Sequence, residues 1–140
     1  VYPIMPLARY GWKLADFRQR FHLGLTRTLC HCGFEFEPTL PGAGIWGKSG
    51  ALAACGLGET AGITHHGAWL NVNPDMHDFG AVDIVPPASV SQSVTTVMSS
   101  LLTEQRRPIR MPTVRSAIVE HLAAAFGCDA PHVTTGHPWL

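Results

Sequence analysis

The stretch ALAACGLGETAGITHHGAWLNV, residues 51–72, decides the fold class. Two apolar runs, 51–57 and 63–72, flank a glycine-containing segment at 58–62. Apolar runs of this length on either side of a short glycine-containing turn are typical of a β-hairpin. The stretch therefore predicts two antiparallel strands.

Amphipathic helices are predicted on both sides of this hairpin. Apolar side chains recur every three or four residues over 13–32 and again over 114–126. This period places them on one face of a helix. Gly33 and Gly127 follow the two patterns, as helix ends favour, and Thr113 is the predicted N-cap of the second helix. Strands between two long helices predict an α+β domain with a mostly antiparallel sheet.

Shorter elements fill the remaining chain. Residues 2–4 read as an extended piece and residues 34–37 as a strand, because apolar and acidic residues alternate there. A turn is predicted at 47–50, and a short helix at 94–101. The tail, 128–140, has two prolines and no hydrophobic period, so the sequence predicts one domain over the residues before it.

Composition limits the classes of partner. The chain has 140 residues, 14% charged residues and no net charge at pH 7. Since about 25% charged residues is usual, this low fraction suggests that part of the surface is covered by another protein. Zero net charge provides no overall basic field for a nucleic acid. No apolar run approaches the ~20 residues of a membrane-spanning helix.

Four arginines gather around the start of the second long helix: Arg106, Arg107, Arg110 and Arg115. A solvated, positively charged linker is the plainer interpretation. The functional interpretation is a contact with an acidic partner or with RNA phosphates, for which arginine is well suited.

The four cysteines, Cys30, Cys32, Cys55 and Cys128, show no disulfide or zinc spacing. We expect them to be reduced and mostly buried. The Cys30-His31-Cys32 run offers three ligand types, but neighbours at a helix end point in different directions. The sequence therefore predicts no metal site and no cofactor.

Three stretches, in order, resemble the octanoyltransferase family, also called lipoate-protein ligase B. Residues 44–46 and 52–57 are similar to the family's Gly-Val-Trp and apolar-Ala-Ala-apolar-Gly-apolar segments. Residues 64–73 are similar to its Thr-x-His-Gly-x-Ala-Leu-Asn pattern. Residues 84–86 and 94–97 are similar to its Pro-Cys-Gly segment and the Val-Thr-Ser-Leu stretch beyond it.

The resemblance implies an α+β domain like those of lipoate-protein and biotin-protein ligases, over residues 1–127 and followed by the tail. It also implies transfer of an octanoyl group from acyl carrier protein to a lysine of a lipoyl-accepting domain. In the family the group passes through a thioester on a cysteine, beside a supporting lysine. The positions that match the family pattern, and that we expect to outline its pocket, are Gly56, Thr64, His66, Gly67, Leu70 and Asn71.

The positions of the family's catalytic residues hold other amino acids in this chain. Its cysteine position holds Pro87, its lysine position holds Ala51, and its acyl-pocket stretch would precede Val1. Neither proline nor alanine supplies a nucleophile or a base. Lys48 and Cys55 are the nearest candidates to replace them. By strand alternation Cys55 shares a face with Ala51, although a buried core role is the plainer interpretation of this cysteine.

Three hypotheses follow from the residues and the resemblance. The sequence favours a catalytically inactive octanoyltransferase-like protein that serves as a structural subunit of a larger assembly, such as a mitoribosome. The first alternative is an active octanoyltransferase with a relocated catalytic pair. The second is a module that binds carrier protein or an acyl chain without turnover. The resemblance places all three in the mitochondrial matrix, with no membrane contact.

Overall fold

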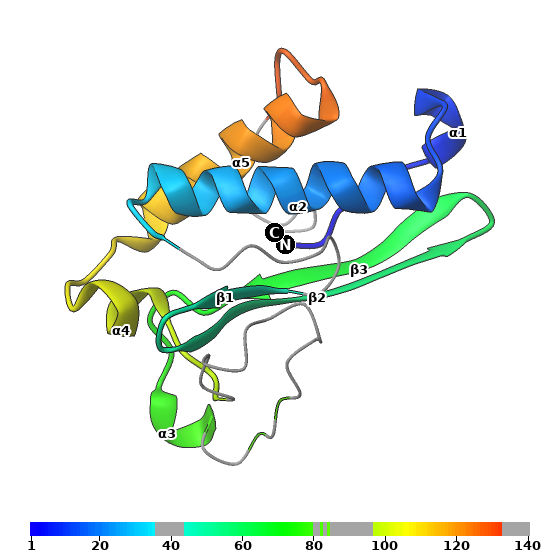
Figure 1. Cartoon of the computed structure of the whole chain (residues 1–140). Coiled ribbons are helices and arrows are strands. Elements are labelled where there is room, and N and C mark those ends of the chain that lie inside the picture. The colour runs from blue at the N-terminus through cyan, green and yellow to red at the C-terminus, as the bar shows by residue number, and fades with distance from the viewer. Residues whose placement is uncertain (36–43, 80–81, 83, 85–96, 133–140) are drawn as a thin grey trace, which may run out of the picture.

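A computed structural model describes residues 1–35, 44–79, 82, 84 and 97–132 of the chain. A β-sheet carries two long helices on one of its faces (Figure 1). Strands β1 (Ile45–Gly47), β2 (Gly50–Thr60) and β3 (Ile63–Leu70) pair antiparallel in that order. The predicted α+β class and the predicted hairpin are confirmed.

The β2–β3 hairpin is longer than its apolar pattern indicated. Its strands run on to a two-residue turn, Ala61-Gly62, where both residues have positive φ angles of 51° and 77°. Such a turn matches the right-handed twist of its strands. The register places Gly56 opposite Gly67, so two residues without side chains meet in the middle of the hairpin.

A bulge interrupts β2 near its start. Ile45 pairs with Ala53, but the next residue, Trp46, pairs with Ala51, which leaves Leu52 as an extra residue. Leu52 and Ala53 are consecutive, yet both are buried in the main core. A bulge of this kind exchanges the two faces of the strand beyond it.

The main core lies between the sheet and the long helices. It comprises Phe21, Leu25, Leu29, Phe34, Ile45, Leu52, Ala53, Ala68, Val72, Leu101, Val114 and Leu122. A second cluster consists of Trp46 and Ala51, with Ile84 and Met98 packed against them. Cys55 packs against the main core, whereas Ala51 belongs to the second cluster. The predicted shared face of Cys55 and Ala51 is therefore wrong, because the bulge separates them.

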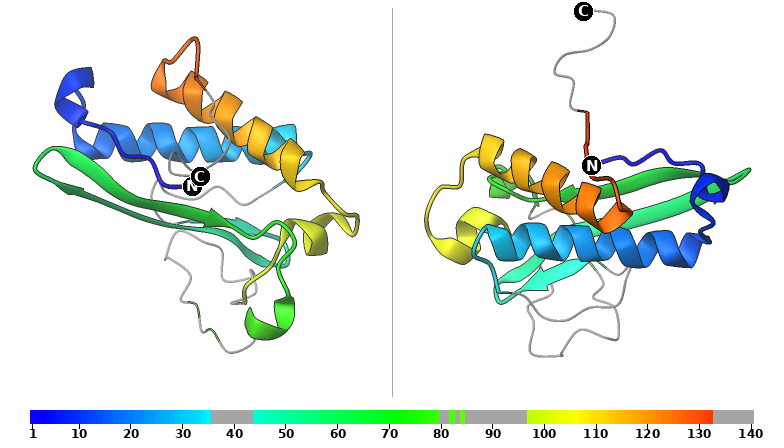
Figure 2. Two further views of the ribbon diagram at one scale, coloured as in Figure 1. Left: turned by 180° about the vertical axis from the view of Figure 1, so that it is seen from behind. Right: turned by 90° about the horizontal axis from the view of Figure 1, so that it is seen from above.

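Helices α2 (Leu14–His31) and α5 (Met111–Phe126) lie side by side over the sheet (Figure 2). Both predicted helices are confirmed. Helix α5 begins three residues earlier than expected, and its N-cap is Arg110 rather than Thr113. Pro112 explains the difference, since the first turn of a helix tolerates a residue without an N–H group.

Gly24 allows the close approach of α2 and α5. A Cβ atom built on Gly24 would lie 2.5 Å from Leu122 Cδ2 and 3.1 Å from Leu122 Cα. The sequence indicated only the helix-weakening effect of this glycine. Its position against the backbone of α5 shows why a larger residue would push the helices apart.

The predicted helix at 94–101 is wrong over its described residues, 97–101, of which only Leu101 is helical. Ala51 N donates to Val97 O at 2.9 Å and Ser99 N donates to Ala51 O at 2.8 Å, which holds 97–99 extended beside β2. Helix α4 (Leu101–Gln105) starts only after Ser100, whose Oγ accepts from Thr103 N at 3.2 Å. Pairing with the sheet has overridden the helical pattern here.

Residues 1–6, the N-terminal segment, run antiparallel along β3. Val1 N donates to Ala68 O at 2.7 Å, and Ala68 N donates to Val1 O at 3.0 Å. Thr64 N donates to Met5 O at 3.0 Å, in the same register. The predicted extended piece is therefore confirmed, and it continues the sheet beyond β3.

Two short helices, α1 (Leu7–Tyr10) and α3 (Met76–Phe79), were not predicted. Phe34 and Glu35 form no strand, and the rest of that predicted strand lies outside the described residues. Residues 128–132 of the tail contain neither helix nor strand. Within the described residues, no helix is both long and apolar enough to cross a membrane.

Candidate functional site

A shallow groove of about 280 Å³ lies where the N-terminal segment meets the hairpin. Its lining residues are Val1, Tyr2, Gly56, His66, Gly67, Ala68 and Trp69. The paired glycines leave its floor without side chains, and Trp69 is 57% exposed. A mostly apolar concave surface with one imidazole suits a small apolar ligand that carries a polar end.

The two glycines have different roles in this groove. A Cβ atom on Gly67 would collide with Val1 O and approach Pro3 Cδ, so the N-terminal segment can pass only over a glycine. A Cβ atom on Gly56 would meet nothing within 4 Å. Gly67 therefore positions the wall of the groove, whereas Gly56 keeps its floor open.

His66 has a strained backbone at the edge of the groove. Its φ angle is 61°, a left-handed conformation that costs an L residue roughly 1–2 kcal/mol. Its exposed ring contacts Tyr2 edge-on at a centroid distance of 6.1 Å, and His65 at 4.6 Å. Backbone strain of this kind gathers at functional sites, because the surrounding structure must maintain it.

The other three predicted pocket residues, Thr64, Leu70 and Asn71, do not line the groove. Thr64 is buried, and its Oγ1 accepts from Met5 N at 2.9 Å and donates to Pro3 O at 3.0 Å. Asn71 Nδ2 donates to Ser99 O at 3.0 Å. Leu70 packs against the main core. Of the six positions, Gly56, His66 and Gly67 line the groove, and Thr64 holds the N-terminal segment that walls it.

Ala51, at the family's lysine position, is buried against Trp46 in the second cluster. The bulge places Ala51 on the same sheet face as Gly56, five residues along the strand. At about 3.3 Å per residue the two positions are roughly 16 Å apart. Pro87, at the family's cysteine position, lies outside the described residues.

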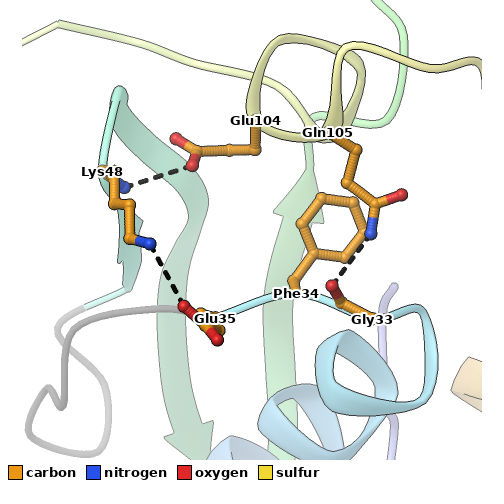
Figure 3. A pocket seen from close by; sticks show the side chains of 6 residues that line it. All are labelled: Gly33, Phe34, Glu35, Lys48, Glu104 and Gln105. Atoms are coloured by element: carbon orange, nitrogen blue, oxygen red, sulfur yellow. Dashed lines mark hydrogen bonds and ion pairs between the residues drawn. The ribbon is translucent and has the colours of Figure 1, made fainter.

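Lys48 occupies a different pocket from the groove. It lies on the β1–β2 turn, in a cavity of about 180 Å³ shared with Glu35 and Glu104 (Figure 3). Its Nζ is 3.1 Å from Glu35 Oε2, while its backbone N donates to Glu104 Oε2 at 3.2 Å. Both members of the ion pair are largely exposed, so it contributes little stability. The structure does not bring Lys48 to Cys55.

Cys55 carries no activated thiol. Burial raises the pKa of Cys55 to about 11, although a backbone hydrogen bond from Gly44 acts in the opposite direction. At neutral pH this side chain is a neutral core thiol. The prediction that the cysteines are mostly buried is wrong: Cys30 and Cys128 are exposed, and the other two are half-buried. All four are free.

The four arginines surround the connection between α4 and α5, and all are exposed. Arg106 ends α4 in a left-handed conformation, and Arg107 Nε donates to Gln105 Oε1 at 2.8 Å. Arg110 and Arg115 lie at the start of α5. Their contact with an acidic partner or RNA stays a prediction.

Sequence reasoning missed several lining residues of the groove. Val1 and Tyr2 come from a segment about sixty residues away, and no local pattern links them to the hairpin. Trp69 had a usable signal: strand alternation places it on the same face as Gly67, away from the core.

No family model matches the chain. Individual curated relatives do match along nearly its whole length. An octanoyltransferase of Roseiflexus sp. (strain RS-1) is 31% identical over 142 residues, covering 99% of this chain and 56% of that protein. Octanoyltransferases of Chloroflexus aggregans and Xylella fastidiosa are each 28% identical and cover 89% and 100% of this chain. This chain spans about half the length of these relatives.

These relatives correct the favoured functional hypothesis. The prediction of a catalytically inactive structural subunit of a larger assembly is wrong, because the relatives carry the name of the active transferase and nothing in them indicates a subunit role. Of the motifs from which the family was inferred, those within residues 44–73 lie on and next to the sheet, and part of the second lines the groove. The chain therefore belongs, by sequence similarity along nearly all of its length, to the octanoyltransferase family.

Proposed function

We propose that this protein transfers an octanoyl group from a thioester donor to a lysine of an acceptor domain. The similarity to octanoyltransferases along 99% of the chain carries the proposal. By family resemblance, the donor is octanoyl-loaded acyl carrier protein and the acceptor is a lipoyl domain. The described part of the chain supplies an apolar groove for the acyl chain.

The octanoyl chain lies on the bare floor at Gly56, beside the Trp69 ring, with its thioester toward His66. Burying methylene groups in this groove stabilises the complex by about 0.8 kcal/mol for each one fully removed from water. None of the four cysteines lines the groove. We therefore assign the attack to the acceptor's lysine amine itself, without a thioester on this chain.

In this step the amine nitrogen attacks the thioester carbonyl carbon, and a carbon–nitrogen bond forms as the carbon–sulfur bond breaks. The His66 imidazole accepts the proton that the amine loses and returns it to the leaving sulfur. An imidazole can act as the base in the first transfer and, once protonated, as the acid in the second. His66 lines the groove and has the strained backbone described above.

The proposal is tested with the full chain, octanoyl-loaded carrier protein and a lipoyl domain. Mass spectrometry of the lipoyl domain reports the added octanoyl group. Replacing Gly56 with leucine places a side chain in the groove, and no atom lies within 4 Å of its Cβ position. We expect G56L to lose at least about tenfold in kcat/KM, which corresponds to ~1.4 kcal/mol of transition-state binding.

A matched control adds the same side chain elsewhere. Ala15 is exposed on α2 and does not line the groove, so A15L should transfer at the unchanged rate. Absence of transfer by the unchanged protein would contradict the proposed activity. If that protein still bound octanoyl-loaded carrier protein, the hypothesis of a binding module without turnover would replace it.

Location in the mitochondrial matrix rests on the family resemblance alone and stays a prediction. Fluorescence imaging of the tagged protein in its own cells tests it. A signal that does not coincide with a matrix marker would contradict it.

A further inference from the structure

Three metal-ligating side chains meet where α2 ends beside α5. His31 is the last residue of α2, while Glu120 and His121 are neighbours on α5. One ligand atom from each lies within 4.8 Å of the other two. The closest pair is His31 Nδ1 and His121 Nε2, at 3.1 Å.

Buried helix packing fixes this arrangement. Thr28 on α2 is fully buried, and its Oγ1 lies 3.4 Å from Ala117 O on α5. His31 comes three residues after Thr28, and His121 comes four residues after Ala117. Residues three or four apart occupy the same helix face, so both histidines extend the same contact by about one turn.

His31 Nδ1 and His121 Nε2 form a hydrogen bond at 3.1 Å, and this spacing is close to that of two nitrogens bound to one transition-metal ion. Tetrahedral zinc with Zn–N bonds of about 2.0–2.1 Å places two ligand nitrogens about 3.3 Å apart. His31 Nδ1 and His121 Nε2 need to separate by only a few tenths of an ångström to reach that value. The Glu120 carboxylate has a larger gap to close, within the 4.8 Å limit, and the three rotatable bonds of glutamate permit that movement.

The donor set distinguishes between classes of metal. Two imidazole nitrogens and one carboxylate oxygen form a set that zinc uses in proteins. Magnesium and calcium prefer oxygen ligands alone and fit poorly here. His31 and Glu120 are exposed and His121 is half-buried, which leaves room for a water molecule as the fourth ligand. Within the described parts of the chain, the Glu120 carboxylate forms no ion pair.

We propose that His31, Glu120 and His121 bind one Zn²⁺ ion, with water in the fourth position, and thereby clamp the end of α2 to α5. The sequence did not predict this site because the two histidines are 90 residues apart. A cation that binds only the folded arrangement stabilises it in proportion to its occupancy. The site lies on the helices, away from the groove.

The test titrates the metal-free full chain, kept reduced, with Zn²⁺ in a calorimeter and with Co²⁺ by visible absorption. We expect one equivalent to bind, with tetrahedral cobalt bands and a rise in the thermal midpoint. H31A and H121A should each weaken binding at least about tenfold and remove the thermal shift, since three ligands become two. E120Q should weaken binding to a smaller degree.

Two matched variants separate this site from other metal-binding groups. His77 is exposed on α3, so H77A should bind Zn²⁺ like the unchanged protein. C30S should also bind unchanged. Zinc binding that survives in H121A, or disappears in C30S or H77A, would overturn the assignment. If H121A fails to fold by circular dichroism, H31N and E120Q provide the same comparison. No substrate is present, so the result is independent of the transfer assay.

Discussion

Replacing Thr64 with valine should weaken the attachment of the N-terminal segment to β3. Thr64 is only 1% exposed, and its hydroxyl group bonds both to Met5 N and to Pro3 O, at 2.9 and 3.0 Å. Valine has nearly the same shape but can form neither hydrogen bond. The backbone hydrogen bond from Thr64 N to Met5 O remains in the variant.

The expected loss follows from these two contacts. Each hydrogen bond contributes about 1 kcal/mol net, and the buried methyl group of valine returns up to ~0.8 kcal/mol. Leaving Met5 N without a partner adds to the cost. We therefore expect T64V to lower the free energy of unfolding by about 1–2 kcal/mol, or roughly 4–8 °C in the thermal midpoint.

Urea denaturation of T64V beside T60V provides the comparison. Thr60 is exposed at the end of β2, where its hydroxyl group lies 3.1 Å from His65 Nε2. T60V should therefore remain within about 0.5 kcal/mol of the unchanged protein. Hydrogen exchange at the Ala68 amide, which donates to Val1 O, should accelerate in T64V alone. Equal unfolding free energies for the two variants would refute this reasoning.

Two further predictions concern the contact between α2 and α5 at Gly24 and the half-buried thiol of Cys55. G24L should lower the free energy of unfolding by about 1–3 kcal/mol or more, because the new side chain has no room beside Leu122. Urea denaturation checks this against S116L, an exposed position on α5, and equal stabilities would contradict it. Cys55 should alkylate more slowly than exposed Cys30 at pH 8, and its rate should rise with pH toward about 11. In the folded state the pKa of Cys55 is raised above its usual value near 9, so the stability that this thiol contributes is complete below pH 9. That contribution is lost between about pH 9 and 11, by at most ~1.4 kcal/mol of unfolding free energy per pH unit. A flat profile of unfolding free energy over this pH range would contradict the prediction.

Periodicity predicted the elements whose contacts are local. Helices α2 and α5 have apolar residues every three or four positions, and the hairpin has two apolar runs around a glycine-containing turn. In each case the signal depends on neighbours within a few residues. Only the ends of these elements differed from the prediction. Helix α5, for example, has its N-cap at Arg110 because its first turn tolerates Pro112.

The candidate site was less predictable because one extra residue changes which side chains share a face. The two-residue alternation of a strand placed Cys55 beside Ala51, and the bulge at Leu52 separated them. Nothing in the apolar run signals that bulge. Three of the residues matched to the family pattern line the groove, but the segment that walls it comes from the start of the chain, about sixty residues before the hairpin.

The prediction of a short helix at 94–101 failed for a related reason. Residues 97–99 pair with Ala51, nearly fifty residues earlier, and this long-range pairing outweighs local helix propensity. His31 and His121 were likewise joined only by the crossing of two helices. Contacts of this kind depend on the assembled fold and leave no local pattern.

The pairing of the N-terminal segment with β3 has a consequence for the order of folding. The β2–β3 hairpin closes through a two-residue turn, and hairpins of this kind form within about 1–10 μs. Val1 and Ala68 are separated by 67 residues, so their pairing must first overcome the entropy of closing a long loop. We expect the hairpin to form early and the segment to dock late. The groove would then be the last part of the protein to assemble, and the first to open when the fold loosens.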